Sequence, residues 1–359
     1  MNQTGVRVVG SRRAARTSSG RTSVVERVED TAGQSMRDLK VGIDISPLQL
    51  TTAGTARYLR KLLGALKGVE VLRYEMYGAS RTRKIVRDTF WYQGTLPRRA
   101  RRDGVDVLHC PAHRGPLRSA TPLVLTLHDL AVLRHPETFN RWTRTYSRLV
   151  LPRLARAATR VIAVSEFTAR EAVELIGVDE DRVRVIPHGV EAPFTPGGAA
   201  ATGDYALAVG TIEPRKNLER VAEAARRAGV ELRIAGAPGW GSVDVQSLGL
   251  VGDEELAELY RGASCLVYTS LYEGFGLPVL EAMACGAPVV TSAGSAPAEV
   301  ADGAAVLVDP LDVEAIAAGI QEARRRRDEL RATGLERARG FTWEAAAAAT
   351  VEVYREAAA

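Results

Sequence analysis

The chain has 359 residues, which is more than one ordinary hydrophobic core organises and suits two domains. Its 46% hydrophobic and 25% charged residues are typical of a soluble globular protein, and no apolar run approaches the roughly 20 residues that span a membrane. The net charge of +5 is modest for a nucleic-acid-binding protein of this size, but it suits an enzyme for anionic substrates or a protein that touches an anionic membrane.

Residues 1–38 differ in kind from the rest of the chain. They are rich in Arg, Ser, Thr and Gly and show no apolar periodicity, so we predict a disordered N-terminal extension. The segment has no apolar stretch of the kind that secretory signals contain. Met36 is a candidate translation start, because the first ordered pattern begins just after it.

Apolar stretches of strand length then alternate with helical patterns, which is typical of a parallel sheet covered by helices. We therefore expect residues 39–195 to form a doubly wound α/β domain. Its predicted strands are residues 41–45, 105–108, 123–127, 161–164 and 183–187.

Three residues beside these strands are candidates for ligand contact. Gly54 and Thr55 stand in a loop before a helix, where a glycine lets an anion approach the free backbone N–H groups. His128 follows strand 123–127, and polar residues at the carboxyl end of a parallel strand point into the ligand crevice. A lone histidine is by default a hydrogen-bonded core or turn residue, so its position alone does not assign a role.

Residues 141–160 read as a basic amphipathic helix, although Pro152 is expected to break or kink it. Such a surface suits an anionic membrane, and a solvated helix face explains the pattern equally well. The arginines are residues 141, 144, 148, 153 and 156, and they interleave with Trp142, Tyr146, Leu149 and Leu154.

A segment rich in Pro, Gly and Ala around residues 193–203 is the predicted interdomain linker. The alternation of strands and helices then restarts, which predicts a second α/β domain over residues 204–340. A long helix over 313–339 and a final Ala-rich helix over 343–359 are expected to close the chain. The predicted strands of the second half are residues 206–209, 232–235, 248–251, 265–269, 288–291 and 304–308.

Two loops of the second half carry candidate phosphate-binding groups. Arg215 and Lys216 stand where the loop after strand 206–209 enters a helix. A guanidinium can hold two phosphate oxygens and an ammonium supplies a mobile point charge, although an exposed basic helix start would look the same. Gly274 and Gly276 precede a second helix with Pro278 in its first turn, and this arrangement aims backbone N–H groups at an anion.

Two carboxylates frame the glycine loop, namely Glu273 within it and Glu281 in the helix that follows. Acidic groups next to an anion site are explained if they hold hydroxyls, which sugars and riboses supply. For any single glutamate the plainer interpretation, a solvated surface side chain, is the more frequent one.

The string S-x-x-E-G-F-G-L-P-x-x-E-A-M-A-C-G-x-P-V-V over residues 270–290 resembles the E-x7-E segment of retaining glycosyltransferases with the GT-B fold, family 4. The strings T-L-H-D-L, V-S-E-F-T-A-R-E and G-x4-R-K-N resemble the same family, and the likeness extends over nearly everything after residue 40. Two positions depart from it: Ala53 replaces a usual glycine, and His188 stands where the family has asparagine.

The resemblance implies two Rossmann-like domains whose parallel sheets face across a cleft, with the last helix crossing back to the first domain. Acceptor binding is expected near Gly54 and Thr55, and V-S-E-F-T-A-R-E adds Ser165 to the substrate-binding candidates. His128 is expected to reach the donor sugar from the first domain. The donor side is expected to comprise Arg215 and Lys216 at the diphosphate, Glu281 at the ribose, Val251 at the base, and Glu273 with Gly274, Phe275, Gly276 and Leu277 at the sugar.

These assignments predict a retaining transferase that moves a hexosyl group from a nucleoside diphosphate sugar to a hydroxyl of a glycan or lipid-linked glycan, as in polysaccharide biosynthesis. Mannose from GDP-mannose is the expected donor, by similarity to bacterial mannosyltransferases. Fixed cations imply that no metal is needed, and the nucleotide-sugar is a co-substrate, so we expect no cofactor. We also expect no nucleic-acid partner and a cytoplasmic enzyme, peripheral to the inner face of the plasma membrane. Same-face attack and double displacement both stay open.

Rival functions are an epimerase or phosphorylase of the same fold, or a nucleotide-sugar-binding regulator without turnover. A phosphorylase needs a pyridoxal lysine, and Lys216 is the only lysine after residue 84. Metal-site patterns are weak: Asp179–Asp181 read as a solvated turn, and no helix is expected to align His109 with His113. Cys110, Cys265 and Cys285 lie in apolar runs and favour buried thiols over a disulfide framework.

Overall fold

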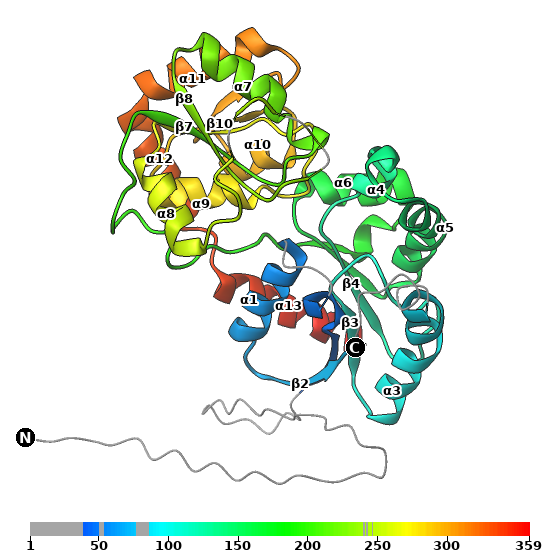
Figure 1. The fold of residues 1–359 in the computed structure, drawn as a ribbon. Coiled ribbons are helices and arrows are strands. Elements are labelled where there is room, and N and C mark those ends of the chain that lie inside the picture. The colour runs from blue at the N-terminus through cyan, green and yellow to red at the C-terminus, as the bar shows by residue number, and fades with distance from the viewer. Residues whose placement is uncertain (1–38, 50–53, 77–85, 240, 242, 246) are drawn as a thin grey trace, which may run out of the picture.

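The computed structural model describes residues 39–359 apart from 50–53, 77–85, 240, 242 and 246, and it divides into two lobes (Figure 1). The predicted N-terminal extension and Met36 lie outside the described residues, as does Ala53.

The first lobe is built on a six-stranded parallel sheet with the strand order β2-β1-β3-β4-β5-β6. The central strands are buried on both faces, as their near-continuous apolar sequences require. The strands are β1 (Leu39–Asp44), β2 (Val69–Tyr74), β3 (Val107–Cys110), β4 (Leu123–Leu127), β5 (Arg160–Ala163) and β6 (Val183–Val185).

Helices cover both faces of this sheet. One core cluster joins β1 and β3 to α1 and to the last helix of the chain, α13, while another joins β3 and β4 to η2, α3, α5 and α6. The helical elements are η1 (Ser46–Gln49), α1 (Gly54–Ala65), the π-helical η2 (Arg87–Thr95), α3 (Leu96–Arg102), α4 (Ala131–Arg134), η3 (Pro136–Thr138), α5 (Arg141–Ala157), α6 (Glu166–Ile176), η4 (Glu180–Arg182) and α13 (Trp343–Ala358).

The second lobe holds a five-stranded parallel sheet with the order β11-β10-β9-β7-β8. Its strands are β7 (Tyr205–Val209), β8 (Glu231–Ala235), β9 (Cys265–Tyr268), β10 (Val289–Ser292) and β11 (Val306–Val308). Its helices are η5 (Pro214–Lys216), α7 (Leu218–Arg227), α8 (Asp253–Gly262), α9 (Leu277–Cys285), α10 (Ala296–Ala301), α11 (Val313–Arg325) and α12 (Arg327–Ala338).

Both sheets reverse their strand order at a comparable place, which confirms the predicted pair of doubly wound folds. The reversal falls between β1 and β3 in the first sheet and between β7 and β9 in the second. Loops at the carboxyl ends of the strands beside such a point form the ligand crevice of an open α/β sheet. The loops after β7 and β9 are the two glycine-containing loops that the sequence singled out.

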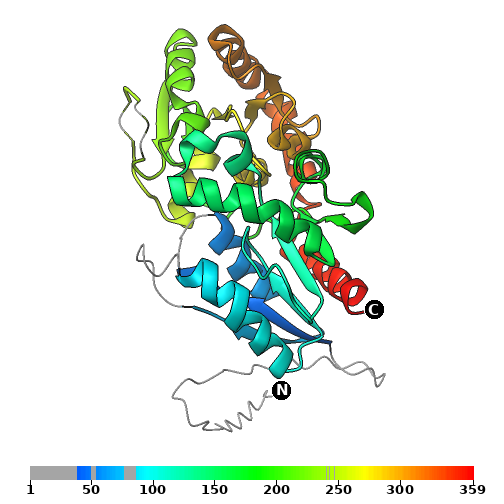
Figure 2. The same ribbon diagram turned by 90° about the vertical axis from the view of Figure 1, so that its right-hand side faces the viewer.

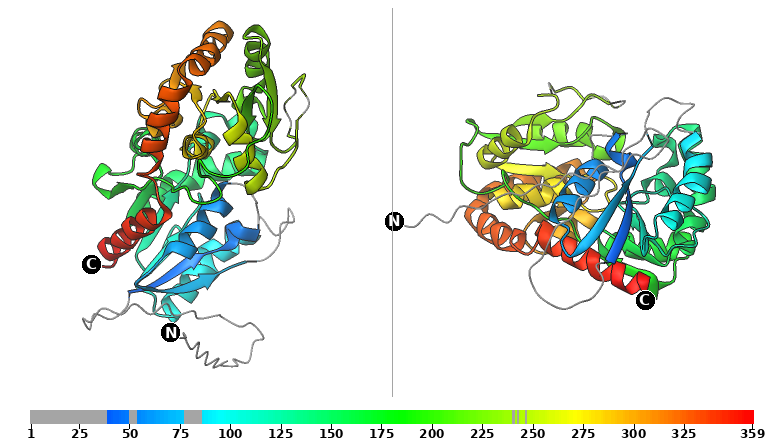
Figure 3. Two further views of the ribbon diagram at one scale, coloured as in Figure 1. Left: turned by 90° about the vertical axis from the view of Figure 1, so that its left-hand side faces the viewer. Right: turned by 90° about the horizontal axis from the view of Figure 1, so that it is seen from below.

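Helix α13 follows the second domain in sequence but packs on the first (Figures 1 and 3). Trp343 and Tyr354 are buried in the core cluster that contains β1 and α1. The hydroxyl of Tyr354 lies 2.7 Å from Nδ1 of the buried His109. The chain passes from the first domain to the second near Val190 and returns near Phe341. These two segments lie side by side, because the Val190 amide donates to the carbonyl of Phe341 at 3.0 Å.

The structure corrects three predictions about local elements and adds one strand that was not predicted. Residues 248–251 form no strand, because Gly249 has φ +76° and only Ser247 bridges to β8. The predicted helix over 313–339 is two helices that meet at Arg326. Pro152 does not break α5, which continues to Ala157. Strand β2 was not predicted, because its sequence VEVLRY carries two charges and edge strands tolerate them.

Candidate functional site

A cleft of about 1000 Å³ separates the two domains, and its walls contain all but one of the thirteen predicted site residues. The first domain contributes one side of α1 and residues after β4 and β6, and the second contributes the loops after β7 and β9 and the starts of α8 and α9. The predicted residues that line it are Gly54, Thr55, His128, Arg215, Lys216, Val251, Glu273, Gly274, Phe275, Gly276, Leu277 and Glu281.

Ser165 is the exception, because its side chain is buried beneath the cleft wall. Its hydroxyl accepts from the Thr168 amide at 3.0 Å, which caps α6, and donates to the Gly274 carbonyl at 2.7 Å. The Thr168 hydroxyl donates to the same carbonyl at 3.0 Å. Ser165 therefore anchors the glycine loop of the second domain to the first domain and does not face the cleft.

The loop after β7 places two cations against one carboxylate. Lys216 Nζ lies 2.6 Å from Glu273 Oε1, and Arg215 Nη1 lies 3.1 Å from Glu273 Oε2. Asn217 fixes the turn: its φ is +61°, and its side-chain amide donates to the Thr269 and Pro310 carbonyls at 3.0 and 2.6 Å. The Arg215–Lys216 turn and the glycine loop therefore meet at one point in the cleft.

The protonation states of this cluster follow from burial and charge. Burial acts to raise the pKa of Glu273, but the Lys216 ammonium and Arg215 guanidinium outweigh it and hold that pKa at about 2. Burial likewise acts to lower the pKa of Lys216, and the Glu273 carboxylate outweighs it, so the net shift is upward. Both cations are thus fully charged at neutral pH before any ligand arrives.

Helix α9 begins at the glycine loop, and the residues at its start, Gly276, Leu277 and Pro278, line the cleft. Gly276 is the N-cap with φ +106°, a conformation that side chains rarely adopt, and no side chain caps the helix. The helix N-terminus therefore adds a positive partial charge close to Lys216 and Arg215. Cations, amides and helix dipole together make a site for a diphosphate.

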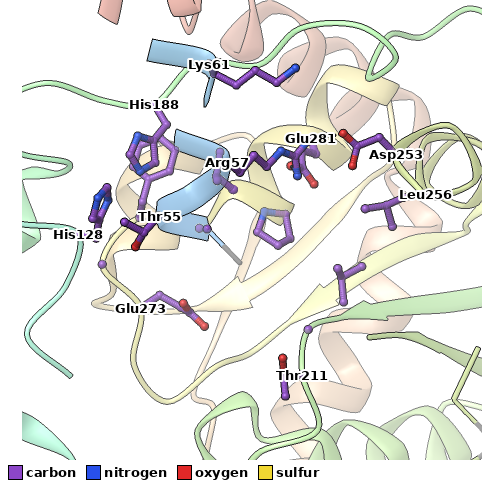
Figure 4. Close-up of a pocket in the computed structure, with 18 of the residues that line it drawn as sticks. Thr55, Arg57, Lys61, His128, His188, Thr211, Asp253, Leu256, Glu273 and Glu281 are labelled. Carbon is purple, nitrogen blue, oxygen red and sulfur yellow. Dashed lines mark ion pairs between the residues drawn. The ribbon is translucent and has the colours of Figure 1, made fainter. Parts of the chain in front are cut away.

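Glu281 lies one turn into α9 and is paired across the cleft with a residue that the sequence analysis missed. Arg57 Nη1, from α1, lies 2.7 Å from Glu281 Oε1, and Arg57 Nη2 lies 3.7 Å from Asp253 (Figure 4). The Tyr260 hydroxyl donates to Glu281 Oε2 at 3.2 Å. Burial raises the pKa of Glu281 to about 7, although the Arg57 guanidinium opposes the rise.

Arg57 was overlooked because an arginine on the polar side of an amphipathic helix ordinarily faces solvent. Its spacing from Gly54 in the sequence could have indicated that it faces the cleft. Gly54, Arg57 and Lys61 lie three and four residues apart on one face of α1, and all three line the cleft. Lys61 is paired with Glu191. The candidate glycine therefore marked the cleft-facing side of the whole helix.

His128 lies where the sequence predicted, at the end of β4 and on the cleft wall. Its Nε2 lies 3.0 Å from the Pro111 carbonyl oxygen, which can only accept, so Nε2 carries the proton and Nδ1 is an acceptor. Burial lowers the pKa of His128 to about 4, so the ring is neutral at neutral pH. His188 also lines the cleft, 5.5 Å from His128 between ring centroids and 4.8 Å from Phe275.

The approach of the glycine loop to β4 leaves no room for a side chain at residue 274. A Cβ there would lie 1.7 Å from the carbonyl oxygen of His128 and 2.8 Å from Asp129 Cβ. We expect Gly274→Ala to lower the free energy of unfolding by about 1–3 kcal/mol, as overpacking does, and to weaken ligand binding by displacing Glu273.

The matched control is Gly64→Ala, since an added Cβ there meets no atom within 4 Å on helix α1. Thermal and urea unfolding of both variants check the prediction. A Gly274→Ala protein as stable as the Gly64→Ala protein would contradict the close packing of the loop.

No helix in the part of the chain that the structure describes is long and apolar enough to cross a membrane. Within the same residues, no three His, Cys, Asp or Glu side chains gather as a metal site would need. The three cysteines are buried and unpaired.

Sequence comparison gives matches over both halves of the chain. Residues 194–340 match the family described as glycosyl transferases group 1, and residues 54–192 match glycosyltransferase family 4. The O-antigen chain mannosyltransferase B of Escherichia coli is 33% identical over 265 residues, which cover 65% of this chain and 70% of that protein. A D-inositol 3-phosphate glycosyltransferase of Geodermatophilus obscurus is 32% identical over 281 residues, covering 67% of this chain and 62% of its own length.

Structure comparison agrees on the fold. The sucrose-phosphate synthase of Thermosynechococcus elongatus superposes with a TM-score of 0.68 at 20% identity, covering 88% of this chain and 98% of that one.

Proposed function

The chain belongs to the group 1 and family 4 glycosyltransferases with the GT-B fold, and from this premise we propose that it moves a hexosyl group from a nucleoside diphosphate sugar to an acceptor hydroxyl with retention of configuration. The observation that carries the proposal is the convergence of Arg215, Lys216, Glu273 and Glu281 on one interdomain cleft. These groups match the charges and hydroxyls of such a donor.

The donor is proposed to lie along the second-domain wall. Its diphosphate is held by Arg215, Lys216 and the N-terminus of α9, which stabilise the negative charge that develops as the glycosidic bond breaks. The ribose hydroxyls donate to Glu281, and the base lies near Val251. The two cations can perform the electrostatic work, so the proposed reaction needs no metal, and the nucleotide-sugar is a co-substrate.

The sugar is proposed to lie between the domains. Its hydroxyls donate to Glu273 and to Nδ1 of the neutral His128, and they accept from the backbone of Gly274, Phe275 and Gly276. The acceptor enters from the first domain beside Gly54 and Thr55, which the cleft exposes.

Mannose from GDP-mannose is the donor that we propose, because the Escherichia coli relative is a mannosyltransferase. The acceptor that we propose is a glycan, free or lipid-linked, of the polysaccharide type. A lipid-linked acceptor would bring this cytoplasmic enzyme to the inner face of the plasma membrane, as a peripheral protein.

A donor screen followed by a turnover assay tests this function. We expect GDP-mannose to raise the melting temperature more than UDP-, ADP- or dTDP-sugars do, because only the matching donor fills the whole site. We then expect release of the nucleoside diphosphate to accelerate when an acceptor glycan is added. Tight donor binding with no release on any acceptor would contradict a transferase and favour a nucleotide-sugar sensor.

A further inference from the structure

Helix α5 presents a face of five arginines to solvent. Its 17 residues contain no acid, and its apolar side, which includes Tyr146, Leu151 and Leu154, is buried against the first domain. We call the exposed arginines the basic face. They are Arg141, Arg144, Arg148, Arg153 and Arg156.

None of these five guanidiniums has an acidic partner among the residues that the structure describes. Arg153 and Arg156 instead donate to backbone carbonyls of their own helix. Another run of arginines in the chain is different: Arg324 pairs with Asp204, Arg325 with Glu322, and Arg326 with Glu329. Acidic partners neutralise those arginines, whereas the arginines of the basic face have no such partner among the described residues.

Large apolar side chains stand exposed beside the basic face. Leu149 is 54% exposed on α5, Trp142 is 37% exposed on the same helix, and Phe90 is 70% exposed on η2. The indole N–H of Trp142 donates to Asp88 of η2 at 3.0 Å, so the two elements are joined. Figure 2 shows α5 and the neighbouring cyan helical segment, which is η2 with α3, on one side of the molecule.

We propose that the basic face, together with Trp142, Leu149 and Phe90, lies on an anionic lipid bilayer. Arginines attract the negative surface of the membrane, while the apolar and aromatic side chains enter the headgroup boundary. The inference rests on the proposed function, because a lipid-linked acceptor is presented at that surface. It places the first domain, with its acceptor side, on the membrane.

Nucleic acid is the other polyanion that five arginines could attract. It offers phosphates but no apolar layer for Leu149 and Phe90, whose exposed area gains nothing from contact with a phosphate backbone. A bilayer accounts for both the charged and the apolar side chains, and it is therefore the partner that we infer.

Co-sedimentation of the full chain with vesicles tests the inference. We expect binding to phosphatidylcholine vesicles that contain phosphatidylglycerol, weak binding to phosphatidylcholine alone, and loss of binding as salt rises. Arg144→Ala with Arg148→Ala is expected to weaken the binding by about 25-fold, at about fivefold for each charge removed. Leu149→Ser is expected to weaken it severalfold, including at high salt, because insertion of an apolar side chain is not screened.

The matched control is Arg325→Ala with Arg326→Ala, which removes the same charge from paired arginines on the second domain. Equal losses in both double variants, equal binding to neutral vesicles, or tighter binding of RNA through the same arginines would each overturn the inference. Donor hydrolysis in solution should be unchanged in all these variants. If the protein binds vesicles but turns over no donor, the proposed function is contradicted, while the inference that the basic face binds the membrane is supported.

Discussion

Lys216→Ala is expected to lower kcat by about 10²–10³, the loss seen when one donor to a developing oxyanion is removed, and to weaken donor binding far less. The ammonium lies at the meeting point of the β7 loop and the glycine loop, held by Glu273 and by the Tyr268 hydroxyl at 2.9 Å. Its charge is fixed before the diphosphate arrives, so it stabilises the departing group without rearrangement. Single-turnover kinetics with saturating donor measure the effect.

Arg226→Ala is the matched control, because it removes an exposed cation from helix α7, which follows the same loop, without touching the cleft. Its guanidinium pairs with Glu223 of the same helix. A double variant with Glu273→Gln sharpens the test, since groups that act as a unit lose less together than the product of their separate losses. A near-native kcat in Lys216→Ala would show that the lysine does not stabilise the departing diphosphate.

Glu281→Ala is expected to weaken donor binding by about 10–100-fold, because hydrogen bonds to a charged acceptor contribute about 1.5–3 kcal/mol. The carboxyl group is buried and points across the cleft to Arg57. Glu281→Gln keeps the size of the side chain and one acceptor oxygen, so it should recover part of the loss. Calorimetric titration with the nucleoside diphosphate measures both variants.

The same residue should give donor binding a pH dependence. Its pKa of about 7 means that the carboxyl is protonated below that pH and charged above it. Donor affinity is therefore expected to rise as pH increases through about 7 and to level off above it. Glu281→Gln has no proton to lose there, so its affinity should be flat over that range. A wild-type profile that is flat as well would show that Glu281 does not contact the ribose.

Most of the site could be predicted because its residues follow apolar strands directly. Arg215 and Glu273 come after β7 and β9, whose sequences are recognisable as buried strands, and parallel strands end at one edge of a sheet. Ser165 also follows a strand at this edge of the sheet, but its side chain is buried away from the cleft. A serine at the start of a helix accepts a hydrogen bond from a backbone amide of the first turn, as Ser165 does here. The pairing of Arg57 could not be predicted, since its partners Glu281 and Asp253 lie more than 190 residues away in sequence and meet it only when the domains face each other.

The errors in the fold have similar physical causes. Residues 248–251 have the composition of a strand, but the left-handed backbone of Gly249 prevents one. No Gly or Pro stands at the junction at Arg326, and contacts of Arg327 with the carbonyls of Ala263 and Ser264 show the tertiary packing that places it. The local sequence around Arg327 does not predict its contacts with Ala263 and Ser264, which lie far away in the chain.

The return of α13 reverses the order in which the two lobes are finished during synthesis. Chains usually complete their N-terminal portion first as they leave the ribosome. Here Trp343 and Tyr354 belong to the interior of the earlier lobe, so the face of the sheet that α1 and α13 share is only partly covered until α13 has emerged. The later lobe has all its strands and α7 to α12 by then. A nascent chain therefore carries a complete second domain joined to a first domain whose core is incomplete, and α13 completes that core.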